Sequence, residues 1–272
     1  MAVKTPLKWV GSKARIMPQL KQHLPDGKRL IEPFAGSCSV MMNTDYDEYL
    51  IADVNPDLIG FYRAAAAAPL DLIDRAKHLF QTYNTEDGYY DIRDSYNHSD
   101  DPEWRPALFL YLNRHGFNGL CRYNKSGRFN VPYGKYKKPY FPVSEIKAFA
   151  EKAKRATFVC ASYSETLDMV RDGYDVVYCD PPYLTESGNF TAYHERGFSH
   201  MDQGRLSRKL RRLSAAGISV VASNSDLETV RCLYAGFQAI RINAPRSVGA
   251  AADSQKIAAE LILKSPVIQG AA

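Results

Sequence analysis

Short apolar runs recur along the chain and predict buried β-strands. Five of these runs are bounded by turn formers or charged residues: 29–34, 49–54, 156–161, 175–180 and 219–224. A short and nearly continuous apolar run is typical of a strand buried on both faces of a parallel sheet. Two further runs, 237–244 and 256–263, follow near the end of the chain. We expect these two to pair as an antiparallel hairpin.

Helical patterns lie between the predicted strands. In the clearest one, Leu206, Leu210 and Leu213 recur at i, i+4 and i+7, and Gly217 marks the stop. Alternation of strands and helices predicts an α/β fold with a doubly wound, mostly parallel sheet of seven strands. Ligands of such sheets bind at the carboxyl ends of the strands, so the residues directly after each strand are candidate site residues.

The segment 59–145 interrupts this alternation. It opens with a helix-forming stretch at 61–80, passes through a polar, turn-rich stretch at 84–102, and continues into a region rich in basic and aromatic residues. We interpret 59–145 as an inserted, mainly helical domain with loops. The catalytic core would then consist of residues 1–58 and 146–272.

The composition describes a globular chain and excludes several classes. Of the 272 residues, 45% are apolar and 24% are charged. The N-terminal stretch lacks the apolar segment of a signal peptide, and no run of about 18 apolar residues occurs. We therefore expect neither a membrane protein nor an exported one. The five cysteines form no C-x-x-C pair and have no metal-spaced histidines nearby, which indicates a reducing cytoplasm and no metal site.

Positive charge is concentrated in one segment. Between residues 104 and 144 there are eight Lys or Arg residues and no Asp or Glu, whereas the rest of the chain holds 27 basic and 30 acidic residues. Ten aromatic residues alternate with these charges. Such a mixture suits a polyanion with stackable bases, which indicates a nucleic acid as the partner. A solvated basic face over a small aromatic core would show the same composition.

The ends of the first two predicted strands indicate a nucleoside site. The stretch EPFAG places Glu32, Phe34 and Gly36 on a tight turn that enters a helix. The turn lacks the G-x-G-x-x-G pattern of dinucleotide sites. Asp53 ends the second strand, 17 residues after Gly36, where a carboxylate can accept both hydroxyls of a ribose. S-adenosylmethionine is the commonest nucleoside without a diphosphate, although glycine turns and strand-end aspartates also occur without any cofactor.

The end of the fourth predicted strand carries Asp180, Pro181, Pro182 and Tyr183 in succession. The prolines donate no amide hydrogen, and their fixed φ directs the neighbouring carbonyl and ring. The run therefore presents two acceptors, the Asp180 carboxylate and the Pro181 carbonyl, beside the face of an aromatic ring. This arrangement suits the exocyclic amine of a nucleobase. The alternative is a rigid turn with no chemical role.

Together these motifs resemble the Dam-type DNA adenine-N6 methyltransferases, which modify adenine in GATC. The likeness rests on PLKWVGSK, EPFAG, DPPY, NFTAYH and the long block LFLYLNRHGFNGLCRYNKSGRFNVPYGKYKKPYF, and it extends from about Leu7 to Lys264. DPPY alone is shared with N4-cytosine and some RNA or protein methyltransferases, whereas the long block is specific to the Dam group. The order of cofactor turn, insert and DPPY is the alpha arrangement of a class I, Rossmann-like methyltransferase dependent on S-adenosylmethionine.

The resemblance implies a role for each matching position. It implies that Asp180, Pro181, Pro182 and Tyr183 are catalytic. Cofactor contacts are implied for Trp9, Lys13, Glu32, Phe34, Gly36, Asp53 and Asp180. No metal is implied. The expected partner is double-stranded DNA, bound by a monomer in the cytoplasm.

The resemblance also implies base-specific contacts. Lys8 corresponds to a residue that contacts the first guanine. Phe117 and Asn118 match residues that enter the duplex once the target base has left it. Leu120 and Arg122 read the last two base pairs, and Pro132 packs with Leu120 against a thymine methyl. Arginine can bind guanine O6 and N7 with two hydrogen bonds, whereas without the resemblance a phosphate contact or a surface salt bridge would be the simpler role for Arg122.

Three positions depart from the family pattern. Cys38 stands where many methyltransferases have a second glycine, and Phe117 stands where tyrosine is known in the family. The loop 245–256 keeps Arg246 and Ser247 but is otherwise rich in alanine. None of these departures removes a catalytic group.

Other activities remain open from the residues alone. An N4-cytosine or RNA amino-methyltransferase would use the same amine chemistry, and a degenerate relative could bind DNA without modifying it. Cytosine C5 methylation needs a nucleophilic cysteine, usually after proline, and no Pro-Cys pair occurs. Cys179 lies inside a predicted strand, where a buried apolar role is simpler.

Overall fold

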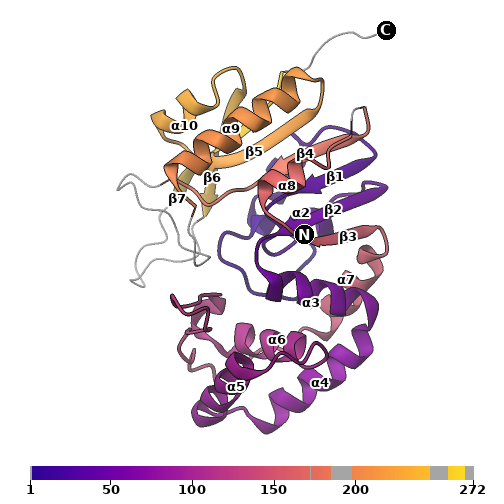
Figure 1. Ribbon diagram of the computed structural model, residues 1–272, viewed down its shortest axis with the longest axis vertical. Helices are drawn as coiled ribbons and strands as arrows, with labels where there is room; N and C mark the ends of the chain where they lie inside the picture. Colours follow the sequence, from indigo (N-terminus) through magenta and orange to yellow (C-terminus); the bar gives the residue numbers. More distant parts are fainter. Residues whose placement is uncertain (1, 172, 185–197, 246–256, 267–272) are drawn as a thin grey trace.

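The computed structural model describes residues 2–171, 173–184, 198–245 and 257–266. A seven-stranded sheet fills the upper part of the molecule as drawn in Figure 1, in the order β3-β2-β1-β4-β5-β7-β6. The strands are β1 (Arg29–Glu32), β2 (Glu48–Asp53), β3 (Ala156–Cys160), β4 (Asp175–Cys179), β5 (Ser219–Ser225), β6 (Gln238–Pro245) and β7 (Ile257–Lys264). All seven predicted strands are present, each close to its expected range.

The sheet is mixed rather than mostly parallel. The four neighbouring pairs from β3 to β5 are parallel, as expected, but β7 runs antiparallel to both β5 and β6. The predicted antiparallel pairing of the last two strands is confirmed. Only the eleven residues 246–256 connect β6 to β7, whereas a parallel return normally needs a crossover connection of about a dozen residues or more. This accounts for the reversed strand.

Neighbouring residues of each strand face opposite layers of helices. Leu30 and Val176 pack with one apolar cluster, whereas Ile31 and Val177 pack with the other, as the two-residue period of a strand requires. The first layer contains η1 (Lys13–Arg15), α1 (Met17–Leu20) and α2 (Ser39–Asn43), and the second contains α8 (Tyr163–Leu167), α9 (His200–Ala215) and α10 (Glu228–Leu233). The predicted helix with the leucine repeat is α9, which begins earlier than its pattern and buries Leu206 and Leu210.

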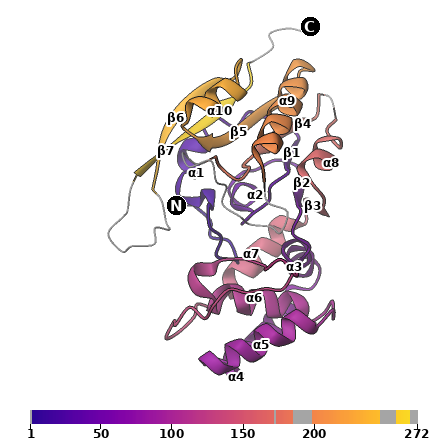
Figure 2. The same ribbon diagram turned by 60° about the vertical axis from the view of Figure 1, so that its left-hand side comes forward.

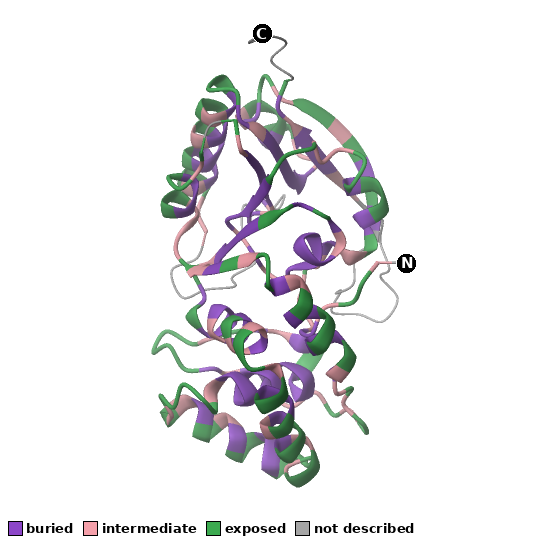
Figure 3. Ribbon diagram, turned by 90° about the vertical axis from the view of Figure 1, so that its right-hand side faces the viewer, coloured by how far each residue is buried: buried purple, intermediate pink, exposed green. Residues whose placement is uncertain are grey.

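Five more helices pack together beside one end of the sheet (Figure 2). They are α3 (Pro56–Ala67), α4 (Pro69–Thr82), α5 (Glu86–His98), α6 (Arg105–His115) and α7 (Val143–Ala153). Helix α6 lies at their centre, is buried from Pro106 to His115, and contacts α3, α4 and α5 (Figure 3). The short η2 (Phe117–Gly119) follows it. The prediction of a mainly helical stretch agrees with these elements.

The structure confirms one detail of that prediction and contradicts another. The stretch 61–80 is helical, as expected, and forms parts of two helices, because Pro69 begins α4 shortly after α3 ends, and proline favours a first turn and disrupts the interior of a helix. The prediction for 84–102 was wrong, because this polar stretch is not a series of turns but mostly helix α5. Thr85 caps this helix by accepting a hydrogen bond from the Gly88 amide, and Tyr89, Ile92 and Tyr96 form its buried face.

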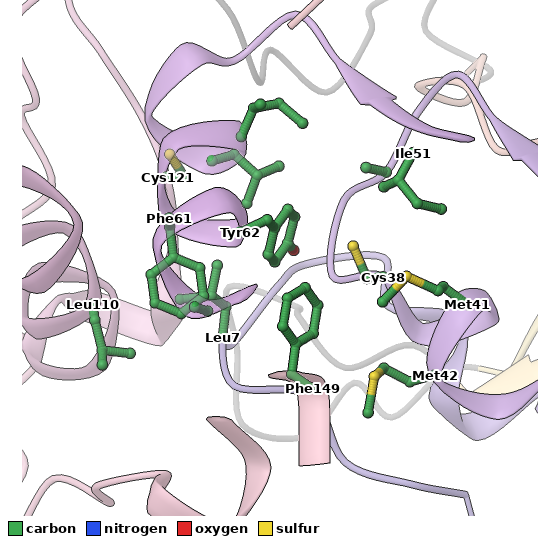
Figure 4. Packing of buried hydrophobic residues seen from close by; sticks show 14 of the residues in the cluster. Leu7, Cys38, Met41, Met42, Ile51, Phe61, Tyr62, Leu110, Cys121 and Phe149 are labelled. Atoms are coloured by element: carbon green, nitrogen blue, oxygen red, sulfur yellow. The ribbon is translucent and has the colours of Figure 1, made fainter. Parts of the chain in front are cut away.

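One apolar cluster joins the sheet to these helices (Figure 4). The rings of Tyr62 in α3 and Phe149 in α7 stack at 5.1 Å between centroids, and Cys38 and Ile51 belong to the same cluster. The cluster continues into α6 through Leu110. Because burial of this apolar surface favours the assembled state, the cluster holds the helices in place beside the carboxyl ends of the strands.

Candidate active site and nucleic-acid interface

A large open cavity lies at the carboxyl ends of the parallel strands. Its volume is about 1750 Å³, more than the 300–1,000 Å³ of a typical small-molecule pocket. Residues after β1, β2, β3 and β4 line it, together with the N-terminal stretch 4–16. The position follows from the fold, since open α/β sheets bind ligands at this edge. The volume would accommodate two small ligands side by side.

A compact charged group lies after β4. The Nζ of Lys13 is 2.9 Å from the Oδ1 of Asp180 and 4.0 Å from the Oε2 of Glu260. The same ammonium group lies 4.7 Å from the centre of the Tyr183 ring. The Tyr183 hydroxyl donates a hydrogen bond to Glu260 at 3.1 Å. We call Lys13, Asp180, Tyr183 and Glu260 the catalytic-edge cluster.

The electrostatics of this cluster favour a strong acceptor. Burial raises the pKa of Asp180 above its ordinary value, while the ammonium group of Lys13 opposes that rise. Burial, with the charge of Asp180, also raises the pKa of Tyr183 well above its usual value. A carboxylate with little solvation but a cation beside it interacts strongly with any donor that approaches.

Asp53 fixes the turn after β1. Its Oδ2 accepts a hydrogen bond from the Gly36 amide at 3.3 Å, and its Oδ1 accepts one from the Asn55 amide at 3.0 Å. Gly36 has φ +45°, and a Cβ there would lie 3.1 Å from the Nε1 of Trp9. Both the backbone conformation and the close approach of Trp9 therefore favour glycine at this position. Cys38, the departure from the family pattern, has φ 56° and is fully buried, so a side chain is tolerated in this left-handed position.

Glu32 ends β1 and is buried, with 3% of its surface exposed. Its Oε1 has no hydrogen-bond partner among the described residues. Burial, with a smaller contribution from Asp180, raises the pKa of Glu32 to about 8. The side chain is therefore mostly a neutral acid at pH 7 and lines the cavity as a potential donor.

Phe34 belongs to an aromatic group at the other side of the cavity. Its ring stacks on Tyr163 at 5.7 Å and meets Phe198 edge to face at 5.8 Å. Sequence reasoning did not identify Tyr163, although it follows β3 closely and the strand-end rule would have found it. It also missed Glu260, which lies within an apolar strand and carries no local signal.

Lys8 lies against the turn that follows α6. The side chain of Asn113 accepts from the Lys8 amide at 2.8 Å and donates to the Lys8 carbonyl at 2.8 Å. A Cβ on Gly119 would lie 2.3 Å from the Cβ of Lys8, so only glycine permits this approach. The Lys8 Nζ lies 3.8 Å from the centre of the Tyr136 ring, whose hydroxyl accepts from the Asn118 amide at 3.1 Å.

A short hairpin carries the remaining predicted contacts. Tyr123 and Phe129 form an antiparallel bridge, and the exposed Arg122 donates from Nε to the side chain of Asn130 at 2.8 Å and from Nη2 to its carbonyl at 3.1 Å. The Phe117 amide donates to the Pro132 carbonyl at 2.9 Å.

The six predicted contact residues are therefore close together, and we call them the hairpin surface: Lys8, Phe117, Asn118, Leu120, Arg122 and Pro132. Phe117 exposes 47% of its surface, and Leu120 is half-buried against the apolar cluster. Lys8 and Asn118 also line the cavity. The hairpin surface thus continues into the site that contains Asp180.

Comparison with known proteins identifies the family. The model of the D12 class N6 adenine-specific DNA methyltransferases matches residues 9–248. This chain belongs to that class. The predicted family and the predicted activity, methylation of adenine N6 in DNA, are thereby confirmed. The motif at 189–194 and the residues Arg246 and Ser247 lie outside the described residues.

Individual members of the class are similar to almost the whole chain. The chain is 54% identical over 97% of its length to the retron Ec67 DNA adenine methylase of Escherichia coli, of which 92% is covered. It is 48% identical over 89% of its length to the DNA adenine methylase of Vibrio cholerae, and 43% identical over 94% to that of Escherichia coli K12, with 88% and 93% of those proteins covered.

The described part of this methyltransferase contains neither a metal-binding group nor a membrane-spanning helix. Within residues 2–171, 173–184, 198–245 and 257–266, no three His, Cys, Asp or Glu side chains are grouped so as to hold a metal ion. In the same ranges, no helix combines the length and the apolar character needed to cross a bilayer.

Proposed function

We propose that this methyltransferase transfers a methyl group from S-adenosylmethionine to adenine N6 in GATC, after the base has left the duplex. One observation carries the proposal. A single cavity joins the Asp180–Tyr183 turn and Asp53 to Lys8 and Asn118 of the hairpin surface. A base extruded beside that surface would therefore enter the space in front of Asp180.

The residues around the cavity fit the proposed cofactor. Asp53, at the end of β2, would accept hydrogen bonds from the ribose hydroxyls of the cofactor, and the ring of Phe34 would contact the adenine ring of the cofactor. Trp9 and Gly36 would shape the turn beside it, as their close approach supports. One oxygen of the Glu32 carboxyl group, which has no hydrogen-bond partner among the described residues, lies in the cavity wall and would bind a polar group of the cofactor.

The Asp180–Tyr183 turn would hold the target base. Asp180 and the Pro181 carbonyl would accept the two N–H bonds of N6, which prevents the amine from rotating and directs its electron pair away from the turn. Tyr183 would stack on the base. When bound, S-adenosylmethionine supplies the electrophilic methyl group. The charge of Asp180 would stabilise the positive charge that grows on N6, and N6 then releases one proton.

This mechanism needs no nucleophilic residue and no metal ion. Its rate gain would come from orientation of the amine and from electrostatic stabilisation. The Lys13 ammonium group favours the ionised form of Asp180, and the bond from Tyr183 to Glu260 fixes the ring. Both contacts support a site that is arranged before the base arrives.

The hairpin surface would read the site. The Arg122 guanidinium would bind guanine, Lys8 would contact the first guanine, and Leu120 with Pro132 would detect a thymine methyl. Phe117 and Asn118 would fill the space left by the extruded adenine, since an inserted aromatic ring restores part of the lost stacking. The exposed basic residues between Lys125 and Lys138 would bind phosphates. Arg105 and Arg114 belong to the same basic segment but are engaged inside the fold, by Asp57 and by the Pro6 carbonyl.

The remaining proposals concern organisation. We propose that residues 59–145 are the target-recognition domain, inserted between residues 1–58 and 146–272 of the catalytic core. Their mainly helical character supports this division, although they share an apolar cluster with the core. We further propose that the enzyme acts as a monomer in the cytoplasm, an environment that suits its five free thiols.

Transfer of a labelled methyl group tests the proposed function. The enzyme would be incubated with labelled S-adenosylmethionine and one of three matched duplexes, which contain GATC, GATG, or GATC methylated on both adenines. We expect label in the first duplex alone. Label in none of them, while DNA and cofactor still bind, would indicate a non-enzymatic binder. Label in the methylated duplex would mean that the target is another atom.

A further inference from the structure

Two buried amide side chains support the Asp180–Tyr183 turn through hydrogen bonds. The Nε2 of Gln203, in α9, donates to the Pro182 carbonyl at 2.8 Å, and the Nδ2 of Asn224, in β5, donates to the Oε1 of Gln203 at 3.3 Å. The Ser225 amide donates to the Oδ1 of Asn224 at 2.9 Å. Gln203 and Asn224 have no exposed surface. Three hydrogen bonds thus connect the end of β5 to the peptide between Pro182 and Tyr183.

The two ends of this chain determine its direction. The Pro182 carbonyl can only accept, and the Ser225 amide can only donate. The Gln203 amide must therefore direct its NH2 group towards the turn, and Asn224 must direct its NH2 group towards Gln203. If either amide were reversed, two acceptors or two donors would face each other in the buried interior. The orientation is a property of the pair rather than of either residue alone.

We propose, on the basis of the function proposed above, that Gln203 and Asn224 are positioning residues for methyl transfer. Neither side chain would touch the base or the cofactor. By fixing the peptide plane after Pro182, they direct the Pro181 carbonyl and the Tyr183 ring towards the target amine. Proline has one fixed φ, so few other torsions in this turn can compensate for a rotation of that peptide.

The loss of this support should affect the chemical step more than binding. A displacement of about 1 Å at the reacting centre can reduce a rate about 100-fold. The proposed ribose contact at Asp53 and the DNA contacts at Lys8 and Arg122 lie on other elements. We therefore expect kcat to fall while KM for S-adenosylmethionine and Kd for DNA change little.

Three variants test the chain of amides. Gln203→Met has a similar size but cannot donate to the turn. Asn224→Asp can accept from Ser225 but cannot donate to Gln203, so it favours the reversed Gln203 amide. We expect each to reduce kcat about 10-fold to 100-fold, and the double variant to lose no more than the worse single one, because residues of one network are not additive. Ser207→Ala is the control, a buried hydroxyl of α9 that bonds only to the Gly204 carbonyl within the described residues.

The pH dependence of Gln203→Glu separates positioning from general support of the fold. A protonated glutamic acid can donate to the Pro182 carbonyl, whereas the carboxylate repels it. The ratio of its kcat to that of the wild type should therefore rise as pH falls, while the ratio for Gln203→Met stays constant. Melting temperatures of all variants would be measured at each pH, so that a loss of folded protein is corrected for.

The possible results distinguish failure of the positioning role from failure of the proposed function. If the wild type methylates adenine and both Gln203→Met and Asn224→Asp have the kcat of the wild type, the positioning role is overturned and the proposed function stays intact. So would losses that multiply in the double variant, or a flat ratio for Gln203→Glu. If the wild type transfers no label to adenine, the proposed function and the positioning role both fail.

Discussion

The catalytic-edge cluster and the hairpin surface lie along one cavity but differ in their internal contacts. In the cluster, Lys13 links two carboxylates and Tyr183 bonds to Glu260, although these residues come from distant parts of the chain. On the hairpin surface, the side-chain bonds of Arg122 reach only Asn130, eight residues away, within the described residues. The first region is arranged before any ligand binds, whereas the bonds of Arg122 in the second are local and, under the function proposed above, would be exchanged for contacts with DNA.

This contrast matches two physical demands. Catalysis gains most when donors and acceptors need no rearrangement during the reaction. Recognition of a base requires hydrogen-bonding groups that are exposed and free to exchange partners, while the backbone that carries them stays fixed. Asn113 and Gly119 provide that fixed backbone beneath Lys8.

The largest effect should come from Asp180→Ala. It removes the proposed acceptor of the target amine and leaves Lys13 without its closest partner. We expect turnover to fall by at least about 1000-fold, while Kd for DNA changes less than about threefold because the hairpin surface is intact. Single-turnover assays and equilibrium binding would measure the two values. Near-normal turnover would contradict the amine-binding role.

Tyr183 should show a smaller effect that depends on the ring. Tyr183→Phe keeps the stacking surface and loses only the bond to Glu260, whereas Tyr183→Ala loses both. Since stacking of a base on an aromatic side chain contributes about 1–3 kcal/mol, we expect Tyr183→Ala to be about 10-fold to 100-fold slower than Tyr183→Phe. Equal rates for the two variants would show that the ring does not stack on the base.

Arg122→Ala should change specificity rather than turnover. Loss of a two-bond contact with guanine would reduce discrimination at one base pair by about 1–3 kcal/mol. Arg128→Ala is a matched control, since Arg128 is also exposed on the hairpin and would contact only phosphate. That control should weaken binding to every sequence and lower its salt dependence. Unchanged specificity in Arg122→Ala would assign this arginine to a phosphate contact.

Glu32→Gln should have the smallest effect on turnover and a clear effect on pH dependence. The folded-state pKa of Glu32 is about 8, above its ordinary value of 4.5, so its contribution to stability is complete below about pH 4.5 and is lost as pH rises through 8. Glutamine resembles the neutral acid but does not ionise, so the variant does not lose stability as the pH rises. Melting temperatures between pH 5 and 9 should fall more steeply in the wild type than in the variant. Parallel curves would indicate an ordinary pKa.

The sequence predicted the strands well because each is a short apolar run between turn formers. It predicted the residues at strand ends, such as Asp53 and Asp180, because the fold brings those ends together. Helix α5 was missed because its apolar face consists largely of tyrosines among polar residues. Glu260 and Gln203 act through contacts across the fold, within a strand and a helix whose patterns report only burial. No spacing in the sequence indicates such partners.

The position of β1 between β2 and β4 has a consequence for how the chain folds. Arg29 and Asp175 are 146 residues apart, yet they pair across β1 and β4 with a buried contact of 2.7 Å. During synthesis β1 therefore waits for its second neighbour until most of the chain has left the ribosome. Closing so long a loop costs entropy and slows folding, whereas α3 to α6 are contiguous and can pack earlier. In pulse-labelling hydrogen exchange, amides of α6 should gain protection before those of β4.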